Sequence, residues 1–262
     1  MQPDVQISSE WQTPPQRLTL AAGEAHVWVA ILGFSHAEAA PVAELLTTDE
    51  RERAARFRFE KDQVQYTAAR GFLRSILGHY LDVDPRKLRF RYNSHGKPLL
   101  TEEFAAAGIE FNLAHSKGLG LFAVTSNHAI GVDIEGTRPD LATMDVANRF
   151  FALPEVKVLA EIPPDQQVAA FFQCWTRKEA FVKARGMGLS LPLDKFVVAF
   201  GPNTTPVLLH TDEDPAAART WTLRDVSPCP DYTGAVAVEA PDIQVRLWRM
   251  THEVFSGTKG GH

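Results

Sequence analysis

The order of the predicted strands and helices repeats once along the chain, and this repeat constrains the fold more than any other feature. In each half a strand precedes a long helix, and a run of strands follows that helix. The first half predicts strands at 25–34, 87–92, 97–100, 109–116 and 118–125 around a helix at 63–81; the second predicts strands at 129–136, 189–200, 220–226 and 232–239 around a helix at about 165–184. We therefore expect an α+β fold of two similar α+β halves, residues 1–127 and 128–262, each of a usual domain size.

Composition and charge argue against several classes of protein. The net charge of −5 and the pI of about 6.0 do not favour binding to nucleic acid or to an anionic membrane surface. No apolar run is long enough to span a bilayer, and the first residues lack the basic and apolar regions of a secretory signal. The two cysteines, Cys174 and Cys229, fit no metal-binding spacing. We expect reduced thiols in a cytoplasmic protein, although one disulfide between them stays open.

Two carboxylates lie one pleat apart on the strand predicted at 129–136. Because side chains of a strand alternate between its faces, Asp133 and Glu135 project together while Val132 and Ile134 point the other way. Two such carboxylates repel each other unless water or a cation lies between them. Taken alone, the pair indicates a solvated acidic face on an edge strand, and a cation site is the alternative.

The segment FQCWTRKEAFVKARG, residues 172–186, predicts a helix with charged groups beside its packing face. Trp175, Glu179 and Lys183 are spaced at i, i+4 and i+8, so they lie along one side of that helix. Taken alone, Glu179 and Lys183 indicate an ordinary ion pair, which contributes only ~0.2–0.5 kcal/mol. Lys178, in the same segment, stays without an assigned role.

The three carboxylates together indicate a metal site. Asp133, Glu135 and Glu179 offer hard oxygen ligands, which suit Mg²⁺, with Mn²⁺ as an alternative. Mg²⁺ usually keeps water and substrate phosphate in its remaining positions, and Lys183 is placed to meet such a phosphate. The chain has no region rich in His and Cys, which disfavours zinc.

A second group of residues could bind phosphate from several segments. Its members are Arg53, Arg70, Lys97, His115 and Ser116. For each one alone, a solvated charge or a structural hydrogen bond is the default interpretation. A phosphate monoester together with a pyrophosphate would, however, require several converging cations. The sequence contains neither a P-loop nor a dinucleotide-binding glycine pattern, so neither of those phosphate cradles is available.

Six short motifs occur in a fixed order through the middle of the chain. They are G-K-P at 96–98, F-N-L-A-H-S at 111–116, G-V-D-I-E at 131–135, F-F at 150–151, W-T-R-K-E-A-F-V-K at 175–183 and G-L-S-L-P-L at 188–193. This order resembles the 4′-phosphopantetheinyl transferases, more narrowly the large, surfactin-synthetase-activating type. The resemblance implies a pseudo-dimer with the active site in the cleft between the halves, and a monomer in solution.

The resemblance also implies a reaction and its substrates. Coenzyme A would donate its 4′-phosphopantetheine arm to a serine of an apo acyl- or peptidyl-carrier protein, and 3′,5′-ADP would leave. Whether the carrier serves fatty acid, polyketide or non-ribosomal peptide synthesis stays open. The segment at 148–159 has apolar side chains beside Arg149 and Lys157, which suits docking of an acidic carrier protein; a place in the core is the equal alternative for its aromatic residues.

Roles follow from the resemblance residue by residue. It implies that Asp133, Glu135 and Glu179 hold Mg²⁺ with the pyrophosphate, that Glu179 is the base for the serine proton, and that Lys183 stabilises the leaving phosphate. For coenzyme A, it implies that Arg53 and His115 bind the 3′-phosphate and that Lys97 contacts the nucleotide. Arg70 and Ser116 would be further coenzyme A contacts. Two positions depart from the family pattern. Ala114 replaces a common serine, and Glu50 replaces a base of some relatives. We expect the 3′-phosphate site to depend more on Arg53, Arg70 and His115.

Two other functions would also use some of these residues. A metal-dependent nuclease combines strand carboxylates with a nearby Glu and Lys, but the net charge of −5 and the absence of a broad basic stripe disfavour it. A non-catalytic module that binds coenzyme A or a carrier protein would be expected to have lost part of the metal set, whereas all three carboxylates and Lys183 are present.

Overall fold

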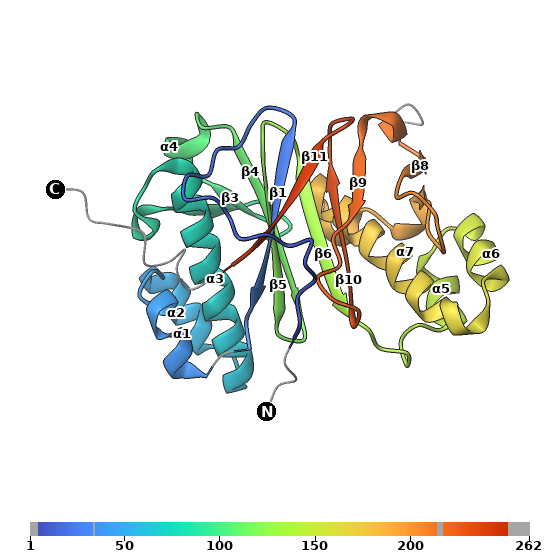
Figure 1. Ribbon diagram of the computed structural model, residues 1–262, viewed down its shortest axis with the longest axis horizontal. Helices are drawn as coiled ribbons and strands as arrows, with labels where there is room; N and C mark the ends of the chain where they lie inside the picture. The colour runs from blue at the N-terminus through green and yellow to red at the C-terminus, as the bar shows by residue number, and fades with distance from the viewer. Residues whose placement is uncertain (1–4, 34, 214–216, 251–262) are drawn as a thin grey trace.

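Two β-sheets lie side by side at the centre of the molecule, and one long helix covers each of them from outside (Figure 1). The computed structural model describes residues 5–33, 35–213 and 217–250. The first sheet has the strand order β11 (Gln244–Arg249), β1 (Glu24–Ile31), β5 (Leu119–Ser126) and β4 (Ile109–Ser116). The second sheet has the order β6 (Ile130–Gly136), β10 (Tyr232–Val238) and β9 (Thr222–Asp225).

The two long helices have the same length and both end in a left-handed residue. They are α3 (Glu60–Leu81) and α7 (Pro164–Arg185), each of 22 residues. Asp82 ends α3 with φ 51°, and Gly186 ends α7 with φ 64°. Glycine adopts this left-handed conformation without steric strain because it has no Cβ atom. The shorter elements are α1 (His36–Ala43), α2 (Thr48–Ala55), α4 (Glu102–Ala105), α5 (Met144–Phe150), α6 (Leu153–Glu161), and the small hairpins β2 (Phe90–Tyr92) with β3 (Pro98–Leu100) and β7 (Phe196–Val198) with β8 (Leu208–Thr211).

The facing sides of the two sheets share one apolar core. Val29 and Leu121 from the first sheet pack in the same buried cluster as Val132 and Ile134 from β6. On their other faces, the first sheet packs against α3 and the second packs against α7. The layers are therefore helix, sheet, sheet, helix, which Figure 1 shows from left to right. No helix within the described ranges combines the length and the apolar content that crossing a membrane requires.

The sequence predicted most of these elements. Both long helices are confirmed, as are β1, β4, β5, β6, β9, β10, the β2–β3 hairpin and the mixed helix-and-sheet fold class. The strand expected at 189–200 was too long. Its first part forms short 3₁₀ turns at Gly188–Ser190 and Leu193–Lys195, and only Phe196–Val198 pairs as a strand. A proline at 192 separates the two turns and cannot donate a backbone hydrogen bond to a sheet.

Strand β6 is the edge strand of the second sheet, but β4 of the first sheet lies beside it, so this edge is not solvated. Its Val132 N–H donates to the Asn112 side chain of β4 over 2.9 Å, which links the sheets where regular pairing stops. Val132 and Ile134 are buried in the shared core, so the predicted alternation of faces is confirmed. Asp133 is only 4% exposed, however, and the interpretation of the acidic pair as a solvated face is wrong.

Helix α7 packs closely against β6 because Gly131 has no side chain. A Cβ at Gly131 would overlap with the carbonyl oxygen of Ala180 and the backbone nitrogen of Ala184. The close contact brings the C-terminal half of α7 against the strand that carries Asp133 and Glu135. The candidate site forms where these two elements meet.

Candidate active site

Lys183 and Asp133 form a direct ion pair between α7 and β6. The Lys183 Nζ lies 2.5 Å from Asp133 Oδ1. Burial opposes the charge of the ammonium, but Asp133, Glu179 and Glu135 outweigh it and raise the pKa of Lys183. The other oxygen, Asp133 Oδ2, is buried and has no hydrogen-bond partner in the part of the chain that the structure describes. Asp133 therefore has one acceptor atom free for a cation or for a ligand donor.

Ser116 orients Glu135. Its Oγ donates to Glu135 Oε2 over 2.9 Å and accepts from the Gly136 N–H over 3.2 Å. Burial raises the pKa of Glu135, and the nearby Asp133 carboxylate raises it further. Ser116, predicted as a coenzyme A contact, thus donates its hydroxyl hydrogen bond to Glu135, one of the candidate metal ligands.

Glu179 is half-buried and lies close to the other two carboxylates. Burial raises the pKa of Glu179, Asp133 and Glu135 add to that shift, and Lys183 opposes it. Among the described residues, its carboxylate has no hydrogen-bond or ion-pair partner. A carboxylate that is unpaired and has a raised pKa can accept a proton or bind a cation.

The donor chemistry of the site fits Mg²⁺, although the carboxylates do not form a ready-made cage. Asp133, Glu135 and Glu179 interact electrostatically and offer hard oxygens, and Asp133 Oδ2 lacks a partner. Within the described ranges, however, no three Asp, Glu, His or Cys side chains lie close enough together to hold a metal ion as they stand. The ammonium of Lys183 instead neutralises part of the negative charge. The prediction that these three residues are metal ligands stays a prediction.

His115 lies at the end of β4, within electrostatic range of both α3 and α7. His115 is exposed at its surface, but the protein atoms around its ring desolvate it and, with the Lys183 ammonium next, lower its pKa, while Asp62 at the start of α3 opposes that shift. Its ring has no hydrogen-bond partner among the residues that the structure describes. His115 is therefore free to donate to an anion, as predicted for the 3′-phosphate.

The two predicted arginines differ in how free they are. Arg53 is exposed, and its guanidinium lies 5.7 Å from the centre of the Tyr66 ring and 5.8 Å from that of Tyr92; no carboxylate within the described ranges pairs with it. Arg70 is buried and donates to Glu50 over 3.1 Å and to the Tyr92 hydroxyl over 2.6 Å. Arg53 can meet a phosphate directly, whereas Arg70 already has a carboxylate partner.

Glu50 explains the engagement of Arg70. This carboxylate is 2% exposed and accepts from Arg70 and also from Arg74, whose Nε lies 2.7 Å away. Glu50 is an acidic residue at a position where some relatives have a basic one. We expected Arg70 to compensate for the missing positive charge at the 3′-phosphate site. In the structure Glu50, Arg70 and Arg74 form a buried cluster between α2 and α3, so of the two predicted phosphate contacts Arg53 has fewer present partners.

Lys97 has its ammonium against the end of α7. The Nζ donates to the carbonyl oxygens of Lys183 over 2.9 Å, Ile130 over 3.1 Å and Ala184 over 3.2 Å. Burial lowers the pKa of Lys97 to about 8. The predicted nucleotide contact of Lys97 stays a prediction, but in this structure three carbonyl groups occupy the ammonium.

Lys178, which the sequence left without a role, is a structural residue. Its side chain is fully buried, and Nζ lies 2.8 Å from Glu155 Oε1 and 2.6 Å from the Phe196 carbonyl oxygen. Glu155 also accepts from the N–H groups of Ala152 and Val198. Sequence reasoning missed Glu155. A lysine on a packing face signals that an acid must be near, but nothing in the sequence says which acid.

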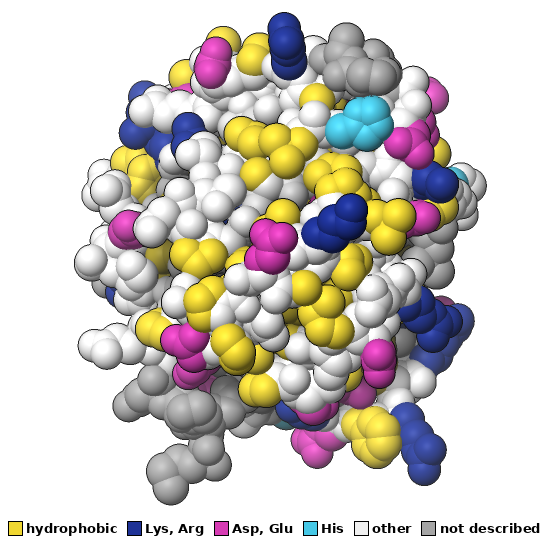
Figure 2. Space-filling model, turned by 90° about the vertical axis from the view of Figure 1, so that its right-hand side faces the viewer, with side chains coloured by type: hydrophobic (Ala, Val, Ile, Leu, Met, Phe, Trp, Pro, Cys, Tyr) yellow, Lys and Arg dark blue, Asp and Glu magenta, His cyan; other side chains and the backbone are white. Residues whose placement is uncertain are grey.

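The segment predicted for carrier docking divides between core and surface. Phe151 is buried, whereas Phe150 is 36% exposed and Leu153 is 77% exposed. The Arg149 guanidinium lies 5.3 Å from the centre of the Phe150 ring. Figure 2 shows the side of the molecule on which α5 and α6 lie in Figure 1, and hydrophobic side chains there alternate with charged ones. The exposed members make an apolar surface beside a cation.

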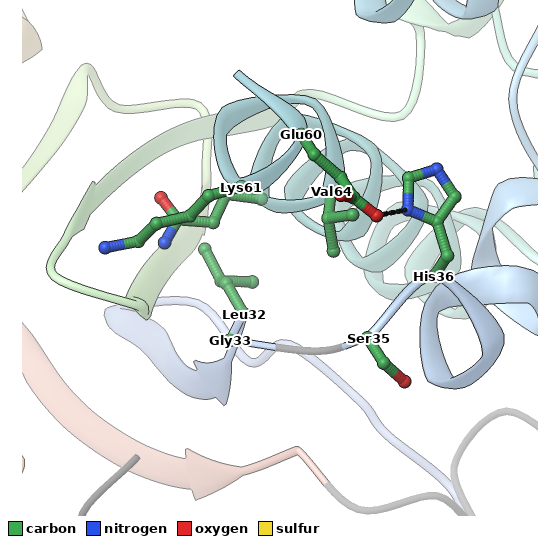
Figure 3. A pocket seen from close by; sticks show the side chains of 8 residues that line it. Leu32, Gly33, Ser35, His36, Glu60, Lys61 and Val64 are labelled. Carbon is green, nitrogen blue, oxygen red and sulfur yellow. Dashed lines mark ion pairs between the residues drawn. The ribbon is translucent and has the colours of Figure 1, made fainter. Parts of the chain in front are cut away.

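A pocket elsewhere lies between the end of β1 and the start of α3 (Figure 3). It has a volume of about 350 Å³, and an ion pair of 3.1 Å between His36 and Glu60 lies at one side of it. Lys61 also lines it. None of the residues that line this pocket is a predicted site residue, so we assign it no part in the reaction.

The arrangement around β6 and α7 defines a class of protein. Carboxylates that suit a divalent cation lie beside Lys183, whose pKa is raised, and the Lys183 ammonium lowers the pKa of the nearby His115. Cations that neutralise a leaving phosphate beside a candidate general base are the parts that a phosphoryl-type transferase needs.

Comparisons with known proteins specify the family. A model described as the 4′-phosphopantetheinyl transferase superfamily matches residues 129–237, and one described as 4′-phosphopantetheinyl transferase, N-terminal, matches residues 35–127. The chain is 39% identical over 242 residues to the 4′-phosphopantetheinyl transferase HetI of Nostoc sp., covering 92% of this chain and 99% of that protein. It is 28% identical over 209 residues to the 4′-phosphopantetheinyl transferase Sfp of Bacillus subtilis, covering 79% and 88%.

The chain belongs to the 4′-phosphopantetheinyl transferase superfamily and is of the Sfp-like type. The resemblance drawn from the motifs is confirmed, and with it an enzyme of the holo-[acyl-carrier-protein] synthase type. This membership removes the nuclease and the non-catalytic module as alternatives. Among solved structures, the holo-[acyl-carrier-protein] synthase of Thermotoga maritima aligns with a TM-score of 0.33 at 18% identity, over 43% of this chain and 63% of that one, a likeness too weak to bear on the fold.

Proposed function

We propose that the protein transfers the 4′-phosphopantetheine arm of coenzyme A to a serine of an apo acyl- or peptidyl-carrier protein and releases 3′,5′-ADP. Family membership supports the reaction class. The observation that carries the proposal is the ion pair of Lys183 with Asp133 beside an unpaired Glu179. In this arrangement Glu179 can take the serine proton while Lys183 stabilises the charge that grows on the leaving phosphate.

Binding of coenzyme A is proposed for residues from both halves. Arg53 and His115 would bind the 3′-phosphate, because both lack an anionic partner among the described residues. Asp133 would contact coenzyme A through the pyrophosphate-bound metal, and Ser116 would contribute by holding Glu135. Arg70 and Lys97 remain predicted contacts, each of which would first have to release its present partners.

Asp133, Glu135 and Glu179 would hold Mg²⁺, or Mn²⁺ in its place. The support is the oxygen donor set, the unpartnered Asp133 Oδ2 and the raised pKa values of both glutamates, which burial causes first and neighbouring carboxylates increase. The ion would supply neutralisation of the pyrophosphate charge. Lys183 would then move its ammonium from Asp133 to the phosphate.

The chain organisation also belongs to the proposal. We propose two α+β halves, residues 1–127 and 128–262, that form a pseudo-dimer with the site in the cleft between them. Support comes from the repeated element order, in which each half has a strand, short helices, a 22-residue helix and then strands. A fused pseudo-dimer needs no second copy, so a monomer is expected. The free thiols of Cys174 and Cys229 support a cytoplasmic location.

The carrier protein is proposed to dock on α5 and α6. Phe150 and Leu153 are exposed there, and Arg149 and Lys157 lie on the same helices. Apolar anchors beside cations suit an acidic helical partner.

Intact-mass spectrometry tests the proposed function. An apo carrier protein incubated with this protein, coenzyme A and Mg²⁺ should gain ~340 Da, the phosphopantetheine group less water. No gain with any of an acyl-carrier, a polyketide carrier and a peptidyl-carrier protein would refute the proposal.

The variant Glu179→Ala tests the role of the base. It should lower the transfer rate at least ~100-fold, the usual contribution of a positioned general base or more. Glu103→Ala, which removes an exposed carboxylate from α4, is the matched control and should retain the wild-type rate. Circular dichroism should show both variants folded. Full transfer by Glu179→Ala would show that the base and metal assignment is wrong.

A further inference from the structure

The turn between β2 and β3 is hydrogen-bonded to the C-terminal end of α7 and to the residues that follow it. Asn93 Nδ2 donates to the carbonyl oxygen of Gly186 over 2.8 Å, and the ring of His95 lies 3.0 Å from the Ser190 hydroxyl. Lys97, at the end of the same turn, donates to three carbonyl oxygens. Residues 93–97 of the first half thus contact the segment that follows the catalytic part of α7.

Hydrogen bonds within the turn fix its backbone, and the backbone fixes where the side chains of the turn lie. Asn93 Oδ1 accepts from the N–H groups of His95 and Lys97, both over 2.9 Å. The Asn93 N–H donates to the Lys97 carbonyl oxygen over 3.0 Å, and Gly96 adopts φ +83°. An asparagine that bonds its own turn in this way restricts the backbone before any partner arrives.

Lys97 meets a chemical need at the end of the helix. The last carbonyl groups of a helix lack intrahelical partners, and this end of the helix carries partial negative charge. The ammonium of Lys97 has three protons, and three carbonyl oxygens lie within 2.9–3.2 Å of it. Two of these acceptors, Lys183 and Ala184, are on α7, and the third, Ile130, is the first residue of β6. One side chain therefore ties the helix to the strand.

We propose that Lys97 is a positioning residue for the transfer reaction: it fixes the last turn of α7 against β6 and so keeps Lys183 in place beside Asp133. The inference rests on the proposed function of that site. Lys183 is held at both ends, because its carbonyl accepts from Lys97 while its ammonium pairs with Asp133. As long as the three-carbonyl contact holds, Lys97 has no proton left for a nucleotide, so positioning and the direct contact predicted from the sequence are alternative roles. In the positioning role its effect on coenzyme A is indirect.

Steady-state kinetics separate positioning from direct contact. Lys97→Met keeps the length of the side chain and removes the ammonium. It should lower kcat at least about tenfold, or about 1.4 kcal/mol in activation free energy, with KM for coenzyme A changed less than about threefold. Lys97→Arg keeps charge and donors and should recover part of kcat. Lys87→Met, at an exposed lysine of the same half, is the control and should match the wild type.

Hydrogen exchange gives a readout that does not depend on activity. In Lys97→Met, peptides that cover residues 178–188 should exchange faster than in the wild type, while peptides from α3 should not change. Asn93→Asp keeps the acceptor that the turn needs and replaces the donor to Gly186 with an oxygen, so it should have the same effects in a milder form. It serves as the second variant if Lys97→Met does not fold.

Two results would overturn the inference. A rise in KM for coenzyme A at unchanged kcat would assign Lys97 to the nucleotide, and unchanged exchange at 178–188 in both variants would show that the turn does not hold α7. If the wild type transfers nothing to any carrier protein, the proposed function fails, and the exchange data still decide whether Lys97 ties α7 to β6.

Discussion

Removing the ammonium of Lys178 should destabilise the protein more than the loss of any surface charge. In the native structure the Lys178 Nζ lies 2.8 Å from Glu155 Oε1, and both side chains are at most 1% exposed. At that separation and an effective dielectric constant of about 20, the attraction is about 6 kcal/mol, and the cost of desolvating both ions offsets much of it. Lys178→Met leaves the Glu155 carboxylate buried and unpaired, which should cost ~3–5 kcal/mol of unfolding free energy.

The cost should depend on pH with a defined sign. Burial already raises the pKa of Glu155 above its ordinary value of 4.5. Without Lys178 the pKa should rise further, and the folded state then binds a proton that the unfolded state releases. The destabilisation should therefore be largest well above the folded-state pKa and should shrink as the pH falls towards 4.5. Urea unfolding at pH 5 and pH 8 measures both values.

Matched variants make this prediction refutable. Lys195→Met removes a lysine that is 52% exposed and 4.0 Å from Asp194, and it should change stability by at most ~0.5 kcal/mol. Lys178→Met combined with Glu155→Gln should recover ~2 kcal/mol or more, because no charge remains buried. A loss below ~1 kcal/mol in Lys178→Met at pH 8, or a loss that grows as the pH falls, would refute the reasoning.

Three further predictions follow from other contacts. Gly131→Ala should push α7 away from β6 and cost ~1–3 kcal/mol of stability by thermal unfolding, with a drop in kcat; an unchanged Tm would contradict the close packing. Lys97 has a pKa of about 8 in the folded state and 10.5 ordinarily, so between pH 8 and 10.5 the unfolded chain binds more protons than the folded one. The stability of the wild type relative to Lys97→Met should therefore rise as the pH increases from 8 to 10.5. Urea unfolding midpoints of both proteins at pH 8 and pH 10.5 check the sign. Arg53→Ala should raise KM for coenzyme A about tenfold or more but leave KM for 3′-dephospho-coenzyme A unchanged; equal effects on both donors would exclude a 3′-phosphate contact.

Period and alternation in the sequence predicted the parts of the fold that depend on local pattern. The 3.6-residue repeat predicted both long helices, and alternation predicted that Val132 and Asp133 lie on opposite faces; in the structure Val132 is in the core and Asp133 pairs with Lys183 of α7. Elements without a strong local pattern were missed, such as the four-residue strand β8 and the short helix α1. β8 forms by pairing with β7, and α1 packs against α3, so contacts with another element rather than a repeat in their own sequence hold them.

The charged residues show where sequence reasoning stops. A lysine or arginine is visible in the sequence, but its partner is not, because carbonyl oxygens and distant acids leave no mark near it. Lys97 was therefore predicted to meet a nucleotide although its ammonium is bonded to the end of α7, and Arg70 was predicted to contact phosphate although Glu50 already binds it. Lys183 and Glu179 could be placed correctly relative to each other because the helical period alone fixes their spacing.

The position of β11 has a consequence for how the protein is made. Trp248 pairs with Trp28 in parallel strands, so the first sheet contains a strand from the last part of the chain. Closing that contact spans about 220 residues, which is slow compared with the closure of local contacts. During synthesis, one edge of β1 therefore stays unpaired until residues 244–249 have left the ribosome. A fragment that ends at residue 127 would keep that edge exposed and should tend to aggregate through it.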